Sequence, residues 1–320
     1  MMSSSAENRV LVNAPNLMFL VDRRRRAANI RLKELVNRRL GELVPAEDCD
    51  PQLLHRAMRY SLLAGGKRIR PLLTMQVAND FGAPEESALD TACAIEMVHT
   101  ASLILDDLPC MDDAALRRGK VTNHRLFGED TAILAATALL NRAFGVVAEC
   151  DHLEASIRLD LVRLLSQSVG SDGIIAGQFL DLRSDWRHQT DVSGLVEMYA
   201  QKTGALFVAA VEAGARIAGV SEAWVSAVRE YAVNLGLAFQ ILDDLLDAHG
   251  RTEEIGKDTG QDSHKTTVVS HLGADEAQLE VRRYMDSAAL ALEPLGDSGT
   301  PLIDLARSYT EPTMERVLYL

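Results

Sequence analysis

The pentapeptide Ile-Leu-Asp-Asp-Leu occurs twice in the chain, at residues 104–108 and 241–245. Each copy follows an apolar run with helical periodicity, so each places adjacent carboxylates near the end of a helix. Aspartate is a poor helix former, and carboxylates at a helix C-terminus oppose the helix dipole. A divalent cation such as Mg²⁺ would compensate, because it prefers hard oxygen ligands. The two copies therefore predict a metal site that serves chemistry rather than stability.

The spacing around each copy supports this interpretation. His99, Ser102 and Asp106 share one helix face, and Pro109 ends that helix. Gln240, Asp243 and Asp247 form a polar stripe on the second helix. A single Asp-Asp pair would more simply be a solvated helix end, but the repeat favours two carboxylate groups that face each other. Three carboxylates on each side would match about three Mg²⁺ ions in charge.

Basic residues supply groups for an anionic substrate. Lys67, Arg68 and Arg70 follow a double glycine at the predicted start of a helix, which is a natural anion site without the spacing of a P-loop. Lys202 falls on the apolar face of its helix, where it either needs a buried anion or extends outward to solvent. The same predicted cationic set contains Arg117, Arg118, Lys257 and Lys265.

Other polar residues are less specific. His99 alone would be read as a core histidine, and we include it because it shares a face with Asp106. Gln178 and Asp181 fit two interpretations, as polar groups in helix packing or as groups that support the site. The sequence shows no arrangement of nucleophile, histidine and aspartate.

Helices must position these residues. Apolar residues recur at helical spacing along most of the chain, no long alternating strand pattern is present, and aromatic residues are only 5%. Glycine and proline breaks separate roughly ten helical segments, and no linker divides them. We predict an all-α fold, with residues 1–25 as a loose leader and residues 26–320 as a single domain.

Composition excludes several classes of protein. The net charge of −13 argues against a nucleic-acid binder. Four cysteines without a CxxC pair favour a reduced, cytoplasmic protein. We find no apolar stretch of 18 residues and predict no membrane span. The arginine run at residues 23–26 is read as the solvated start of a first helix, in preference to a membrane-binding patch.

Several short motifs together resemble the trans-isoprenyl diphosphate synthases, and within them the bacterial geranylgeranyl diphosphate synthases. The resemblance runs from about residue 35 to the C-terminus, with its motifs in the family's order. These motifs are GGKRIRP at 65–71, DDLPCMD at 106–112, RRG at 117–119, GQFLDL at 177–182, KTG at 202–204, FQILDDLLD at 239–247 and GKD at 256–258.

The resemblance implies a role for each candidate residue. Mg²⁺ would be held by Asp106, Asp107, Asp112, Asp243, Asp244 and Asp247. The allylic diphosphate would be bound by Arg117, Lys202 and Lys257. Lys265, which follows His264, would also bind substrate. Isopentenyl diphosphate would be bound by Lys67, Arg70, His99 and Arg118. The reacting centre would be lined by Thr203 and Gln240.

The implied protein is an all-α bundle around a central cavity, usually a homodimer, that condenses isopentenyl diphosphate with dimethylallyl, geranyl or farnesyl diphosphate. Ala101 and Ser102 lie roughly 6–8 Å before Asp106 along the helix. Relatives that stop at fifteen carbons carry a bulky aromatic at one of these positions, so we predict a twenty-carbon product. Met97 or Leu139 would close the pocket. The alternatives are a farnesyl diphosphate synthase, a class I terpene cyclase, a non-catalytic subunit and a helical binding protein without turnover.

Overall fold

The computed structural model describes residues 14–183, 191–249 and 266–318, and the described part is almost entirely helical. The first half contains α1 (Ala14–Leu43), α2 (Gln52–Leu62), α3 (Ile69–Asp80), α4 (Glu85–Asp106), β1 (Leu116–Arg117), β2 (Lys120–Val121), α5 (Asn123–Phe127), α6 (Glu129–Ala148), α7 (Ala155–Val169) and α8 (Ile174–Asp181). The predicted all-α fold is confirmed.

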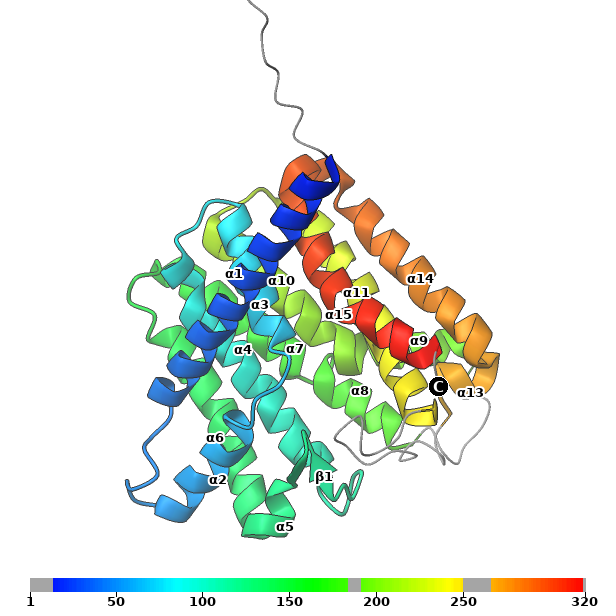
Figure 1. Cartoon of the computed structure of the whole chain (residues 1–320). Helices are drawn as coiled ribbons and strands as arrows, with labels where there is room; N and C mark the ends of the chain where they lie inside the picture. Colours follow the sequence, from blue (N-terminus) through cyan, green and yellow to red (C-terminus); the bar gives the residue numbers. More distant parts are fainter. Residues whose placement is uncertain (1–13, 184–190, 250–265, 319–320) are drawn as a thin grey trace, which may run out of the picture.

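The second half continues the bundle. It contains α9 (Val192–Tyr199), the π-helical turn η1 (Ala200–Gly204), α10 (Ala205–Ala218), α11 (Glu222–His249), α13 (Val268–Leu272), α14 (Ala274–Ala291), the 3₁₀ helix η3 (Glu293–Gly299) and α15 (Thr300–Leu318). In Figure 1, α14 and α15 run alongside α11, while α2, α5 and α6 gather at the opposite end of the molecule.

The helices that carry the Asp repeats belong to the centre of the bundle. α3 packs against α4 and α10, and α10 packs against α11. Small residues allow this close packing, since a Cβ atom on Gly214 of α10 would lie 2.5 Å from the Thr74 carbonyl oxygen of α3. Buried apolar side chains from these helices form a continuous core that also includes α1, α6 and α7. Packing of α4 and α11 within this core therefore fixes the positions of their C-terminal ends.

Two expectations need correction. Helix α1 begins at Ala14, inside the segment predicted as a loose leader, so helical structure starts earlier than the sequence pattern indicated. Two helices, α4 and α6, are long and apolar enough to cross a membrane by length and composition alone, whereas no such stretch was expected. The apolar window of α4 is 67% buried in the bundle, and core helices commonly meet the same criteria.

Candidate active site

The first Asp motif lies where α4 ends and the chain turns back. Asp106 is the last residue of α4 and Asp107 caps it. The backbone N–H of Asp112 then donates to the carbonyl oxygen of Asp106 at 2.9 Å, which holds the following turn against the helix end. Burial raises the pKa of Asp106 to about 6, and neighbouring Asp112 and Asp181 act in the same direction. This carboxylate is therefore placed where a cation would be most stabilising.

The RRG motif contributes to a β-hairpin with a two-residue loop. Arg117 of β1 pairs with Lys120 of β2, and the loop residues Arg118 and Gly119 have φ angles of 54° and 72°. This loop suits a tight hairpin turn, in which both central residues have positive φ. Arg117 donates to Asp107 Oδ1 from Nε at 2.8 Å and from Nη2 at 2.6 Å. The hairpin thus fixes Arg117 to Asp107 of the first Asp motif, and it places Arg118, the next residue, in the loop.

Lys202 lies in the π-helical turn η1. Its Nζ atom donates to Asp181 Oδ2 at 2.6 Å, and it lowers the pKa of Asp106, against the larger effect of burial. Single-turn π-helices are frequent at functional sites. Lys202 therefore pairs with a carboxylate instead of extending outward, and Asp181, which the sequence left undecided, supports the site.

The other side of η1 connects to the second Asp motif. Thr203 Oγ1 donates to Gln240 Oε1 at 2.5 Å, and Gln240 Nε2 donates to Asp244 Oδ1 at 2.9 Å. Tyr199 donates its hydroxyl to the other oxygen of Asp244. The turn η1 therefore lies between the two Asp motifs, with Lys202 directed to the first and Thr203 to the second.

The remaining acidic residues of the second motif lie on the same stretch of α11. Asp247 is buried, and Asp243 is half-buried and raises the pKa of Arg70 against the effect of burial. Gly236 allows α11 to approach η1, because a Cβ atom there would come within 2.8 Å of Gly204 Cα.

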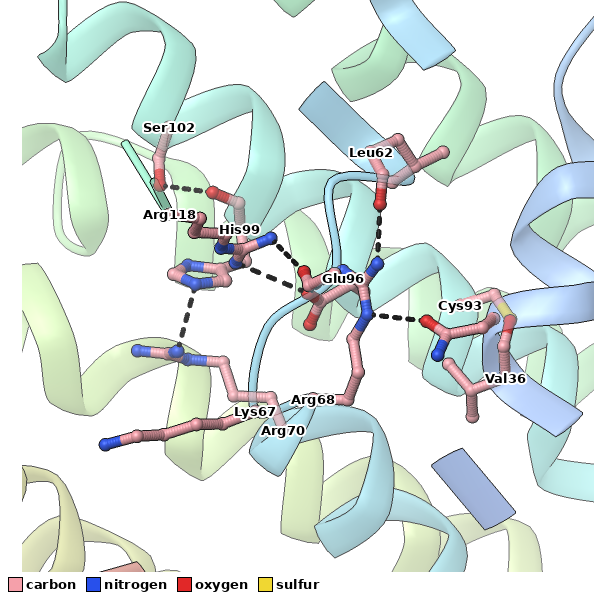
Figure 2. Close-up of polar contacts among 12 residues, drawn as sticks. Val36, Leu62, Lys67, Arg68, Arg70, Cys93, Glu96, His99, Ser102 and Arg118 are labelled. Carbon is pink, nitrogen blue, oxygen red and sulfur yellow. Dashed lines mark hydrogen bonds and ion pairs between the residues drawn. The ribbon is translucent and has the colours of Figure 1, made fainter. Parts of the chain in front are cut away.

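A separate basic cluster forms around α3 and α4 (Figure 2). Arg70 Nη1 lies 3.5 Å from His99 Nε2, and the guanidinium carbon of Arg70 is 4.4 Å from the centre of the Phe207 ring. Lys67 Nζ lies 5.1 Å from the centre of the Phe239 ring, at the edge of the reacting centre predicted beside Gln240. The structure thus brings together the residues predicted for isopentenyl diphosphate.

Burial and like charge dominate the electrostatics of this cluster. Burial lowers the pKa of Arg70 to about 10. The pKa of His99 lies well below its usual value because the ring is buried and Arg70 and Arg118 are near. Arg118 has a lowered pKa for the same main reason, burial. An anion at this cluster would offset the concentrated positive charge.

The donor set fits Mg²⁺. The two motifs offer carboxylate oxygens, which are hard ligands, and the half-buried Asp106 carboxylate has a raised pKa that a nearby cation would lower. Among the described residues, no three His, Cys, Asp or Glu side chains already converge on one point. Mg²⁺ usually takes only one or two carboxylates and completes its shell with water and substrate phosphates, so this arrangement is compatible with it.

The proposed length-determining positions lie on α4. Ala101 is buried, and Ser102 is half-buried with its hydroxyl donating to the His99 carbonyl oxygen at 2.9 Å. Met97 and Leu139 are fully buried, and α4 packs against α6. Lys257 and Lys265 lie outside the described residues.

Two residues of the site escaped sequence analysis. Glu96, buried between Arg68 and Arg118, precedes His99 by three residues and could have been found from that spacing. Tyr199 was not a candidate site residue, and nothing in the sequence indicates its contact with Asp244, 45 residues later.

The fold and the site together are typical of the helical enzymes that act on isoprenoid diphosphates. The chain belongs to the Polyprenyl synthetase family, which matches residues 51–286. This confirms the family predicted from the motifs.

Similar proteins agree with this family. The chain is 40% identical over 277 residues to a geranylgeranyl diphosphate synthase of Cyanophora paradoxa, covering 86% of this chain and 92% of that protein. It is 42% identical over 259 residues to a dimethylallyltranstransferase of Fischerella ambigua (strain UTEX 1903), covering 80% and 75%.

Solved structures show the same fold. An FPP/GFPP synthase from Zymomonas mobilis superposes with a TM-score of 0.82 at 33% identity, covering 90% of this chain and 99% of that one. A geranyltransferase from Helicobacter pylori, complexed with magnesium and isoprenyl diphosphate, has a TM-score of 0.80 at 30% identity, covering 98% and 100%.

Proposed function

We propose that this chain is an Mg²⁺-dependent prenyltransferase that condenses isopentenyl diphosphate with dimethylallyl, geranyl and farnesyl diphosphates to give all-trans geranylgeranyl diphosphate. One observation carries the proposal: the turn with Lys202 and Thr203 lies between two Asp motifs, and a separate basic cluster lies beside them. Two diphosphates of different roles require two such sites. The similarity to geranylgeranyl diphosphate synthases points to the same activity.

The allylic diphosphate would bind at the Asp motifs. About three Mg²⁺ ions, held by Asp106, Asp107, Asp112, Asp243, Asp244 and Asp247, would supply neutralising charge there. Arg117 and Lys202 would contact the diphosphate oxygens as the C–O bond breaks, because charge develops on the leaving group in that step. Lys202 and Arg117 are both held in place by a carboxylate, which limits their reorganisation during the reaction.

The second substrate would be held by Lys67, Arg70, His99 and Arg118. Its alkene attacks the allylic cation, a carbon–carbon bond forms, and a proton leaves the adjacent carbon for the released diphosphate. No protein base is needed in this scheme. The apolar walls around Phe207 and Phe239 would keep water from the cation.

The twenty-carbon product rests on Ala101 and Ser102. Both side chains are small, and they lie on the helix that ends at Asp106, so a growing chain can extend beside α4. Buried Met97 and Leu139 are the proposed floor of this pocket. A farnesyl diphosphate synthase is the competing function, and product analysis distinguishes it.

Specific residues argue against two related functions. A class I terpene cyclase does not need a second diphosphate site, but here buried Arg70 lies beside half-buried His99, with Nη1 at 3.5 Å from Nε2. A non-catalytic subunit typically lacks the Asp motifs, and both motifs are intact in this chain.

Homodimer formation is also part of the proposal. Helix α6 exposes Ile133 and Leu134 by 44% and 59%, so two adjacent large apolar side chains lie on its surface. A second copy would cover these side chains by a two-fold contact. Sedimentation or light scattering should show a dimer, and Leu134→Glu should shift it to monomer. Leu290→Glu, at an equally exposed leucine on α14, should not. A monomeric wild-type protein would reject this point.

The enzymatic assay tests the function as a whole. Purified protein is incubated with Mg²⁺, labelled isopentenyl diphosphate and each allylic diphosphate, and dephosphorylated products are separated by chromatography. We expect a twenty-carbon alcohol. A cyclic hydrocarbon or the absence of elongated product would contradict the proposal. We also propose a cytoplasmic location for this protein. Several similar proteins are described as chloroplastic.

A further inference from the structure

Glu96 of α4 is a buried carboxylate at the centre of the basic cluster (Figure 2). Its Oε1 atom lies 2.5 Å from Arg68 Nη1 and 3.7 Å from Arg118 Nη2. Only 2% of the Glu96 side chain is exposed, so the pair with Arg68 is removed from water. Burying a carboxylate is costly without partners, so the fold must gain either stability or positioning from Glu96.

The two arginines differ in what else holds them. Arg68 also donates to Asn37 Oδ1 at 2.9 Å and to the Leu62 carbonyl oxygen at 2.6 Å, so its guanidinium is fully engaged by the protein. Arg118 has one other strong anchor, from Nη1 to the Gly65 carbonyl oxygen at 2.7 Å. Arg118 is therefore held through Nη1 by Gly65 and through Nη2 by the longer contact with Glu96.

Charge adds to this picture. One carboxylate faces three arginines, Arg68, Arg70 and Arg118, so the cluster carries a surplus of positive charge before any substrate arrives. Burial lowers the pKa of Arg70 and of Arg118, and Glu96 raises both. Glu96 thus stabilises the charged form of Arg70 and Arg118 while leaving enough positive charge to attract a diphosphate.

The position of Glu96 on α4 relates it to the proposed substrate sites. Glu96 precedes His99 by one turn and lies on the helix that ends at Asp106. We propose that Glu96 is a positioning residue, which holds Arg118 and the segment from Gly65 to Arg70 in the geometry that binds isopentenyl diphosphate. This inference rests on the proposed function of the basic cluster.

Glu96→Gln tests the inference because three roles give different results. The substitution keeps the shape of the side chain but removes one negative charge. If Glu96 positions Arg118, the KM for isopentenyl diphosphate should rise, by about ten-fold, with kcat and the KM for farnesyl diphosphate changed less than about two-fold. If Glu96 acts only through its charge, that KM should fall. If Glu96 only stabilises the fold, that KM should stay constant. Either of the last two results overturns the inference.

A matched control exists on α10. Glu212 is equally buried and holds two arginines, with Oε1 at 2.5 Å from Arg216 Nη2 and Oε2 at 2.6 Å from Arg229 Nη2. It lies nine residues beyond Thr203, roughly 13 Å along the helix. Glu212→Gln should lower the melting temperature, as Glu96→Gln does, without changing the KM for either substrate. An equal rise of KM in both variants would attribute the effect to general loosening.

A second variant keeps the test decisive if Glu96→Gln folds poorly. In Glu96→Gln/Arg68→Met both charges of the buried pair are removed, which should recover thermal stability because Arg68 is not left as a buried charge without its partner. The KM for isopentenyl diphosphate should still be raised, since Arg118 stays unrestrained. A recovered KM would show that Glu96 acts only on Arg68.

The same experiment separates this inference from the proposed function. Lys67→Ala is measured in parallel. If Lys67→Ala raises the KM for isopentenyl diphosphate and Glu96→Gln does not, only the inference fails. If neither substitution changes that KM, the assignment of the basic cluster fails.

Discussion

Gly177 of α8 lies against the backbone of Lys202, so closely that a Cβ atom on residue 177 would come within 2.5 Å of Lys202 Cα and closer still to its backbone nitrogen. Backbone atoms cannot move aside as a flexible side chain can. The glycine of the GQFLDL motif therefore permits the contact by which Lys202 reaches Asp181 on the same helix, at 2.6 Å.

Gly177→Ala should displace the turn that carries Lys202 and Thr203. We expect kcat to fall on the order of a hundred-fold, because small misplacements of positioned groups have effects of that size. Gly41→Ala is the control, since a Cβ atom there meets only the end of the Arg59 side chain at 3.7 Å. Steady-state kinetics with farnesyl diphosphate provides the measurement. A fully active Gly177→Ala enzyme would contradict the close-packing argument.

Removal of the metal or of a proposed metal ligand should abolish turnover. Asp106→Ala and Asp243→Ala are expected to lower kcat by roughly three orders of magnitude or more, and EDTA should stop the reaction until Mg²⁺ is restored. Asp113→Ala is the matched control, because Asp113 is exposed and its carboxylate lies 3.6 Å from Arg125 Nη2. Near-normal turnover in Asp106→Ala would remove the basis for the metal assignment.

The two diphosphate sites should separate kinetically. Lys67→Ala and His99→Ala should chiefly raise the KM for isopentenyl diphosphate, whereas Lys202→Ala should chiefly lower kcat, because charge develops on the allylic side in the transition state. Initial rates are measured with each substrate varied in turn. If all three variants changed the constants for both substrates alike, a two-site description would be untenable.

His99 should make the folded state less stable in acid. Its pKa is lowered in the folded protein, so as the pH falls below about 6.5 the unfolded chain takes up a proton that folded His99 does not. Stability is therefore lost as the pH falls, by up to about 1.4 kcal/mol per pH unit. His99→Gln removes this contribution. The difference in unfolding free energy between the two proteins, measured in urea, should be constant above pH 7 and change between pH 6.5 and 5. A flat difference would mean that His99 titrates normally.

The product length should respond to one residue. Ala101→Tyr places a large side chain in the buried space beside α4, one turn before the Asp motif. We expect farnesyl diphosphate as the main product, with the first condensation largely retained. Chromatography of dephosphorylated products measures this. A fifteen-carbon product from the wild-type enzyme, or a twenty-carbon product from Ala101→Tyr, would refute the proposed pocket.

Much of the fold follows from local patterns. The helix with the first Asp motif was predicted to end at Pro109, and α4 ends at Asp106. Apolar periodicity and proline geometry are local properties, so a single sequence contains them. The hairpin of β1 and β2 was missed because its strands have two residues each, too few to form an alternating pattern.

The contacts within the site were less accessible to prediction. The sequence left open whether Lys202 pairs with an anion or extends to solvent, and only the packing of α8 on η1 identifies Asp181 as its partner. Tyr199 and Asp244 are likewise neighbours through tertiary structure alone. The order of the motifs predicts which residue types meet in the site. Which carboxylate pairs with Lys202 depends on how the helices pack, and no local sequence pattern contains that information.

Helix α4 has a consequence for how such an enzyme can change during evolution. Glu96, His99, Ala101 and Asp106 occupy one uninterrupted helix, so their separations along it are set by the rise of about 1.5 Å and the turn of roughly 100° per residue. Insertion or deletion of one residue between Glu96 and Asp106 would change the orientation of Glu96 and the basic cluster relative to Asp106 and the metal site. Product length can therefore be changed by substitutions along α4, whereas a change in the number of residues in α4 would disturb the whole site.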